Sequence, residues 1–221
     1  MDLYLIANIF TLVCALIGFI WGGILFLHPR KALYAQMITL ALGCIAFGRL
    51  FNVIRLLTGG SITERFQLGF FGMVGSLMFF ISSNYGAIDS LIDDGTKKFK
   101  KYRAISIIAP CVAIILYLVL FIAAGEPKLW KILGGILTAF IVFSSYFHLK
   151  HIVFPDVEFG IVKFLRPFNA VALLYDIAIL VECSAMGREN NKVMIVSTFI
   201  TGVFTALLMP MVVRGVRKWY Q

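Results

Sequence analysis

Apolar residues along the chain are grouped into seven long stretches separated by short polar connections. A helix needs about 20 apolar residues to cross a bilayer, because each residue adds 1.5 Å of rise. The stretches meet that length, so the pattern predicts an all-α membrane protein, a seven-transmembrane-helix bundle in a single domain, 1–221. The predicted spans are about 3–27, 32–57, 67–92, 104–124, 129–149, 159–187 and 193–216.

The composition supports this fold class. Hydrophobic residues make up 61% of the chain and charged residues 14%, and the mean hydropathy is +0.94. Soluble domains carry about 25% charged residues, so this chain has too few charges for a surface that faces water. Its aromatic content of 14% is also far too high for a disordered chain. A soluble globular enzyme and a disordered protein are therefore excluded.

The distribution of basic residues predicts the orientation. Twelve of the 20 Lys and Arg residues fall at one end of the predicted spans, five at the other and three inside spans. Cytoplasmic loops carry the excess of Lys and Arg, so we expect the N-terminus outside and the C-terminus in the cytoplasm of a plasma-type membrane. The basic run 97–101 is expected to contact anionic lipid headgroups. This accounts for the net charge of +9 without a nucleic-acid partner.

Motifs for metal or cofactor chemistry are not found in the sequence. The four cysteines fall inside predicted spans, where small buried hydrophobes are expected, and no Cys-x-x-Cys or zinc-type spacing occurs. The first span has no basic leader and is too long for a signal peptide. We therefore predict no metal, no cofactor and no catalytic residue, and the sequence favours a protein that is not an enzyme.

Small residues recur at a spacing that suits close helix packing. Gly18 and Gly22 are four residues apart in the first span, as are Gly72 and Ser76 in the third. Such pairs let two helices approach closely. We expect these contacts inside the bundle, with a homodimer interface as the alternative.

Charged side chains inside spans are the first candidates for function, because a charge at the bilayer centre costs at least about 2.5 kcal/mol. Counting residues from the span midpoints places Arg49 and Asp176 at similar depth in the outer half, which predicts an ion pair. Asn52 lies one turn beyond Arg49 on the same face. Arg55 and Glu182 lie farther out and are predicted at the headgroups.

The sixth span carries a polar stripe. Arg166, Asn169 and Asp176 recur at helical spacing and are predicted to share one face. Arg166 and Asn169 are predicted near the midplane of the bilayer, where they would contact a solute.

The third span carries a second polar group, nearer the cytoplasm. Ser82, Tyr85 and Asp89 follow i, i+3, i+7 spacing and are predicted to share one face, with Asn84 adjacent.

The fifth span adds a histidine to this inner group. His148 is predicted at the same depth as Asp89, with Arg166 slightly deeper in the bilayer. Such a group could relay protons or hold an anionic solute. His151, farther along the span, is predicted to face the headgroups.

These residues predict a transporter of an unidentified small solute through a polar path inside the bundle. Arg49 and Asp176 would form an outer gate, and Asp89 with His148 an inner, protonatable gate. The candidate binding or gating residues are Arg49, Asn52, Asn84, Tyr85, Asp89, His148, Arg166, Asn169 and Asp176.

Three other interpretations stay open. The polar residues can serve only as structural hydrogen bonds between helices. The chain can be a seven-helix receptor, sensor or accessory subunit that works through a cytoplasmic protein partner on the 93–103 loop or the 214–221 tail. It can also be a membrane-embedded enzyme that modifies lipids, which would need a metal.

Overall fold

The structure is a computed structural model that describes residues 3–29, 31–60, 68–155, 161–188 and 191–219. The regular structure within these ranges is helical throughout. Seven helices or helix series are long and apolar enough to cross a membrane. The predicted all-helical bundle is thereby confirmed, and it fits a multi-pass membrane protein.

Five spans are single helices, and two are made of several segments. The single helices are α1 (Leu3–Phe26), α2 (Leu33–Leu57), α7 (Lys128–Val153), α8 (Ile161–Gly187) and α9 (Asn191–Trp219). The third span consists of α3 (Leu68–Ile81), the π-helix η1 (Ser82–Asp89) and α4 (Ser90–Ile92). The fourth consists of η2 (Lys97–Phe99), α5 (Lys100–Ser106), α6 (Ile108–Tyr117) and the π-helix η3 (Leu118–Ala123).

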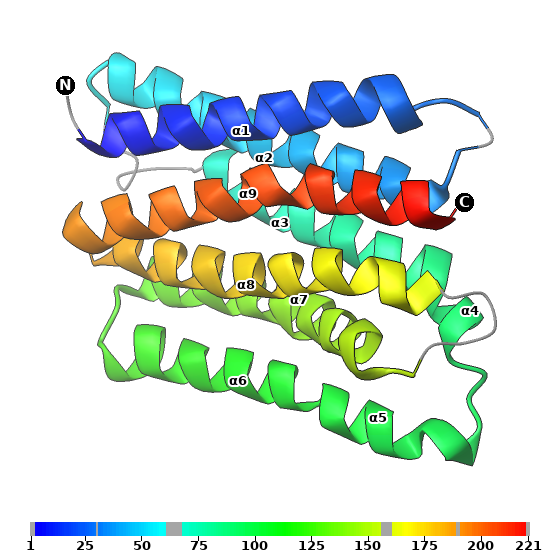
Figure 1. Cartoon of the computed structure of the whole chain (residues 1–221). Coiled ribbons are helices and arrows are strands. Elements are labelled where there is room, and N and C mark those ends of the chain that lie inside the picture. Colours follow the sequence, from blue (N-terminus) through cyan, green and yellow to red (C-terminus); the bar gives the residue numbers. More distant parts are fainter. Residues whose placement is uncertain (1–2, 30, 61–67, 156–160, 189–190, 220–221) are drawn as a thin grey trace.

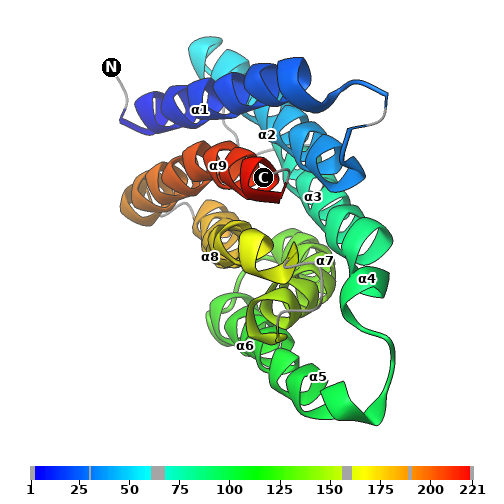
Figure 2. The ribbon, with the colours of Figure 1, turned by 45° about the vertical axis from the view of Figure 1, so that its right-hand side comes forward.

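Six of the spans form a closed ring, and the fourth lies outside it. The contacts around the ring run from α1 to α2, α3, α7, α8, α9 and back to α1. The fourth span packs on α7 through α5 and α6, and it contacts α8 through η3. Figure 1 shows the spans side by side with their connections at two opposite ends, and Figure 2 shows α5 and α6 outside the ring. Because the fourth span is displaced, α3 and α7 become neighbours.

Two predicted boundaries differ from the structure by four residues or more. α7 continues to Val153, beyond the predicted end at 149, and the fourth span begins at Lys97 rather than at 104. Both added segments are basic, so hydropathy falls there, although Lys and Arg are good helix formers. Residue 67 of the predicted third span, residues 159–160 of the predicted sixth span and the chain end 220–221 lie outside the described residues.

Glycines bring α2 and α3 into backbone contact. A Cβ added at Gly72 would lie 2.7 Å from the carbonyl oxygen of Cys44 and 2.7 Å from the Cα of Gly48. Gly18 and Gly22 of α1 face side chains of α2 and α9. These small residues make contacts inside the bundle, as predicted.

Gly72→Ala is expected to lower the free energy of unfolding by about 1–3 kcal/mol, because the added methyl group meets backbone that can yield only if the helices separate. Gly23→Ala is the matched control, since a Cβ there meets only the side chain of Leu27, at 3.8 Å. Thermal melting in detergent should show a lower melting temperature for the Gly72 variant alone. Equal shifts for both variants would contradict the close packing.

The change to π geometry at Ser82 alters which residues of the third span face the bundle. A π-helix closes i to i+5 hydrogen bonds, so its turns hold more residues than α-helical turns. Asn84 is buried, whereas Ser82 and Tyr85 are exposed and Asp89 is partly buried. Of the residues predicted to share one polar face, Ser82 and Tyr85 thus lie on the exposed side, and the adjacent Asn84 faces the bundle.

Candidate functional site

A buried ion pair joins α2 to α8. Both guanidinium Nη atoms of Arg49 donate to Glu182, with Nη2 2.6 Å from Oε2. The side chains are 4% and 0% exposed. The predicted pairing of Arg49 with Asp176 is wrong, and so is the placement of Glu182 at the headgroups. Depth counted from span midpoints neglects the tilt of each helix and the offset between helices. The actual partner, Glu182, lies about 9 Å farther along α8 than the predicted partner, Asp176.

Two further helices, α1 and α9, supply the remaining hydrogen bonds of this pair. Asn8 Oδ1 of α1 accepts from Arg49 at 3.3 Å and from Asn52 at 3.4 Å. Thr198 and Thr201 of α9 donate to the carboxylate of Glu182 at 2.9 and 3.0 Å. We call these residues the Arg49 cluster: Asn8, Arg49, Asn52, Glu182, Thr198 and Thr201. Each charge has several partners, which is the condition under which an ion pair is stable in an apolar interior.

A second buried cluster is centred on His148 of α7. Its Nδ1 atom lies 2.8 Å from Asn169 Oδ1 of α8 and 3.0 Å from Asn84 Nδ2 of η1. Its Nε2 atom lies 3.8 Å from Asp176 Oδ2. The sequence predicted that Asn169 and Asp176 share a face, and the structure confirms it, because both face the same imidazole.

The partners of His148 suit both neutral forms of its ring. If Nδ1 carries the proton, it donates to Asn169 Oδ1. If Nε2 carries the proton, Nδ1 accepts from Asn84 Nδ2. In both forms Nε2 lies 3.8 Å from Asp176 Oδ2, so a proton passes between these two groups only after a small movement of the side chains or through a water molecule.

Buried polar atoms gather around Asp176. Among the described residues, the Asp176 carboxylate has a hydrogen-bonding neighbour in the Ser144 hydroxyl, and His148 Nε2 has no hydrogen-bond partner. Asp176 is fully buried and lies at the centre of the candidate span Leu165–Gly187. Buried polar atoms normally have partners, and exceptions mark places where a proton, a water molecule or a solute binds.

His151 extends the cluster toward one end of the bundle. Its Nδ1 atom lies 2.8 Å from Asn84 Oδ1, and its Nε2 atom lies 3.4 Å from Asp89 Oδ1. Asn84 thus bridges the two imidazoles of His148 and His151. The prediction that His151 faces the headgroups is wrong, because α7 continues past it and its side chain is completely buried against the third span. We call these residues the His148 cluster: Asn84, Asp89, His148, His151, Asn169 and Asp176.

An ion-pair group follows at the same end. Lys150 Nζ lies 2.6 Å from Asp89 Oδ1 and 2.8 Å from Asp93 Oδ2. Arg103 of α5 donates to both oxygens of Asp93, at 2.7 and 2.8 Å. We call Asp89, Asp93, Arg103 and Lys150 the Lys150 group. The sequence assigned Lys150 and Asp93 to loops, so their place in this group was missed.

Asp93 is held in its ionised form by this group. Burial alone would raise the pKa of its carboxyl, but the hydrogen bonds from Arg103 and Lys150 outweigh burial and hold that pKa well below its usual value. A lowered pKa means that the ionised carboxylate stabilises the fold at neutral pH.

Asp93→Asn is expected to lower the free energy of unfolding by about 1–3 kcal/mol at neutral pH, because Lys150 and Arg103 each lose a charged partner. The contribution of Asp93 is complete above its ordinary pKa of 3.8 and is lost as the pH falls toward the folded value. Melting curves at pH 7 and at about pH 3 should therefore show a larger loss for wild type than for the variant. Equal pH dependence in the two proteins would contradict this role.

Two predicted site residues lie apart from these clusters. The side chain of Tyr85 is 64% exposed on the outside of the bundle, and its ring packs against Phe147. Arg166 donates to the carbonyl oxygen of Phe154 at 2.8 Å, just beyond the end of α7. Asp89 contacts His151 rather than His148. Asn84 and His151 connect Asp89 to His148, whereas Arg166 lies outside the cluster, so the predicted group of Asp89, His148 and Arg166 forms only in part.

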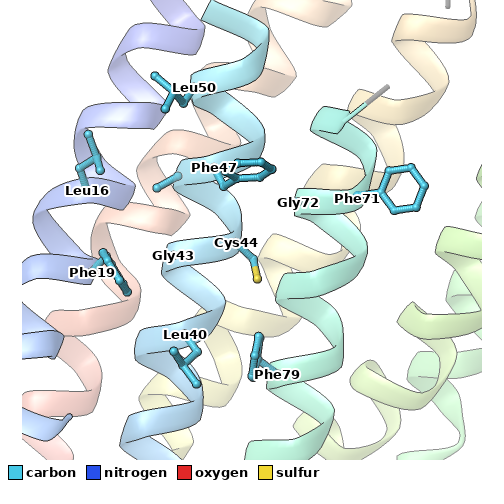
Figure 3. A pocket seen from close by; sticks show the side chains of 11 residues that line it. Leu16, Phe19, Leu40, Gly43, Cys44, Phe47, Leu50, Phe71, Gly72 and Phe79 are labelled. Atoms are coloured by element: carbon cyan, nitrogen blue, oxygen red, sulfur yellow. The ribbon is translucent and has the colours of Figure 1, made fainter. Parts of the chain in front are cut away.

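A groove of about 500 Å³ lies between α1, α2 and α3. Figure 3 shows Phe19, Phe47 and Phe79 around its wall, with the Cys44 sulfur between α2 and α3. The lining residues carry no charge. The groove thus offers an apolar surface without a charged side chain for solute recognition, unlike the surroundings of Asp176.

The part of the chain that the structure describes has no group of three or more His, Cys, Asp or Glu side chains that could hold a metal ion.

Comparison with protein-family models, curated proteins and solved structures finds no match to this chain. The geometry of its own residues is therefore the evidence for its function.

Proposed function

We propose that the protein is a proton-coupled transporter of a small solute, with Asp176 as the central binding group. The observation that carries this proposal is the complete burial of the Asp176 carboxylate, whose nearest basic group among the described residues is His148 Nε2 at 3.8 Å. An ionised carboxylate without a close counter-ion is costly in an apolar bundle. A proton or a positively charged solute removes that cost, so the two compete for one group.

The His148 cluster gives a route for the proton. Asp176 lies 3.8 Å from His148, and Asn84 joins the rings of His148 and His151 by hydrogen bonds of 3.0 and 2.8 Å. His151 in turn lies 3.4 Å from Asp89, whose side chain is 18% exposed. A proton taken from Asp176 by His148 would pass toward Asp89 as the rings reorient around Asn84, and Asp89 would exchange it with water.

The two ion-pair networks would act as gates on either side of Asp176. The Arg49 cluster ties α2 to α1, α8 and α9 in one half of the bundle. At the other end of the bundle, the Lys150 group connects α7 to Asp89 and Asp93, the residues directly before and after α4. A transporter that exposes its site to one side at a time needs a closed contact on each side.

Proteoliposomes that contain a pH-sensitive dye test the proposal. Purified protein is reconstituted, and a panel of hydrophobic amines, amino acids, sugars and carboxylates is added outside. At least one class should change the luminal pH with wild type, and Asp176→Asn should reduce that rate by about 100-fold or more, because the exchangeable proton is lost. Ser82→Ala is the matched control, since Ser82 lies on the exposed side of η1 and its hydroxyl donates to its own helix.

The proposal fails if no class of solute moves protons, or if Asp176→Asn keeps the wild-type rate. A loss of rate in both variants would indicate damage to the fold, and circular dichroism and gel filtration of each variant separate that case.

A further inference from the structure

A pocket of about 200 Å³ lies between α6 and α8, with α7 beneath it. α6 contributes Ala109 and Ala113, both buried, and these small side chains leave the space open. α7 contributes Ile141, and α8 contributes Leu173 and Asp176. Asp176 therefore lies in the wall of a pocket on the side of the fourth span.

The rim of this pocket faces the outside of the bundle. Ile108 and Val112 of α6 line the pocket and are 53% and 41% exposed. The fourth span contacts α8 through η3, where Ser184 donates to the carbonyl oxygen of Leu120 at 3.2 Å. Figures 1 and 2 show α6 along the outer side of the ring. In a membrane, the mouth of the pocket would open toward the lipid.

The chemistry of the lining defines the ligand. Asp176 is the one ionisable side chain among the described residues that line the pocket, and the remainder of the wall is apolar apart from Ser145. An anion would be repelled by the carboxylate, and a wholly apolar molecule would leave its oxygens unpaired. A ligand with an apolar body and one ammonium group matches both the apolar wall and the carboxylate of Asp176.

The volume sets the size of the ligand. An apolar cavity of about 150 Å³ holds one benzene ring. A pocket of about 200 Å³ therefore suits a single ring with a short arm. Such a molecule partitions into lipid when neutral, so it can reach a mouth that opens between α6 and α8.

We infer that this pocket binds a hydrophobic primary or secondary amine of about one ring, with its ammonium group paired to Asp176. The inference deepens the proposed function, because it names the solute class of the same site. With Asp176 protonated before binding, the ammonium displaces one proton: R–NH₃⁺ and Asp176–COOH give the pair R–NH₃⁺ with Asp176–COO⁻, and H⁺ leaves. No bond of the ligand breaks.

The charged neighbours of Asp176 define where that proton goes. His148 of α7 presents Nε2 at 3.8 Å, and the α6 residues that line the pocket carry no ionisable group. On α8 itself, the hydroxyl of Tyr175 interacts with Ser76 at 3.3 Å, and Glu182 is paired with Arg49. His148 is therefore the acceptor that the geometry offers, and one amine exchanges for one proton.

Calorimetry with 2-phenylethylamine and 2-phenylethanol tests the inference on the full chain in detergent. The two probes share a ring and a two-carbon arm and differ in the ammonium group. The amine should bind at least about tenfold more tightly than the alcohol, since only the amine pairs with the carboxylate. Measurements in two buffers of different ionisation enthalpy should show about one proton released per amine bound.

Variants locate the site. Asp176→Asn should weaken amine binding by about tenfold or more and leave binding of the alcohol unchanged. Val112→Phe and Ala109→Leu should weaken both probes, because they fill the pocket. Ile115→Phe is the matched control, since Ile115 lies on the same helix and is 58% exposed. Val112 is also largely exposed, so its variant is expected to fold even if Ala109→Leu does not.

The inference is overturned if the alcohol binds as tightly as the amine, if Asp176→Asn keeps full amine affinity, or if Ile115→Phe weakens binding as much as Val112→Phe. Its failure is distinct from failure of the proposed function. Amine binding with proton release but without proton flux in liposomes would leave the inference standing and reject transport. Proton flux driven by sugars or carboxylates, without amine binding, would support transport and reject the inference of an amine site.

Discussion

Arg49→Met is expected to lower the free energy of unfolding by about 3–5 kcal/mol, because it leaves the carboxylate of Glu182 buried without its counter-ion. The side chain of Glu182 is 0% exposed, and its remaining partners would be the hydroxyls of Thr198 and Thr201. Two neutral hydrogen bonds do not replace a bidentate guanidinium contact. Unfolding in mixed detergent micelles, followed by circular dichroism, measures the loss.

A double-mutant cycle then identifies the partner. Glu182→Leu alone should cost a similar amount, whereas Arg49→Met with Glu182→Leu should be more stable than either single variant, because no charge stays buried. Arg49→Met combined with Asp93→Asn is the control, since these residues share no partner and their effects should add within about 0.5 kcal/mol. Additive effects for Arg49 and Glu182 would refute the ion pair.

His148→Gln is expected to slow proton-coupled flux by about 100-fold, because proton transfer through a positioned group contributes 10²–10⁴-fold. Glutamine keeps an amide near Asn84 and Asn169 but cannot carry a proton between Asp176 and His151. Binding of 2-phenylethylamine should change by less than about threefold, since Asp176 still holds the ammonium group.

The matched control for this variant is His28→Gln. His28 is exposed just beyond the end of α1, and its ring contacts the carbonyl oxygen of Ile24 in that helix at 3.2 Å. The flux assay and the binding assay are run on both variants. Equal flux in wild type and His148→Gln would remove His148 from the proton path, and loss of binding together with flux would give it a structural role instead.

The fold class follows from the sequence because span length and apolar content are local properties. Each of the seven predicted spans corresponds to a helix or helix series. The errors in the predicted boundaries arise where hydropathy alone does not determine the end of a helix. Lys150 and His151 end the apolar stretch of the fifth span, yet α7 carries on through them to Val153. Helix propensity, and not hydropathy, decides that boundary.

The site was predicted in part. His148, Asn169 and Asp176 meet, because helical spacing places Asn169 and Asp176 on one face and any neighbouring helix must contact that face. Asn84 belongs to the same cluster, although Tyr85 and Ser82 do not, since the π-helix changes the number of residues per turn. The polar residues Asn8, Thr198 and Thr201 could have been noted as polar positions in apolar spans, but nothing in their spacing points to Glu182.

Sequence alone is sufficient to predict the seven apolar helices and the shared face of Asn169 and Asp176, because each depends on a single segment of chain. Tertiary packing brings Arg49 to Glu182, places Asn84 between two histidines and sets Asp176 in the wall of a pocket beside α6. Those contacts depend on the order of the helices around the ring and on their offset along the bundle. Both are set by side-chain packing between segments far apart in the chain, which hydropathy and periodicity do not encode.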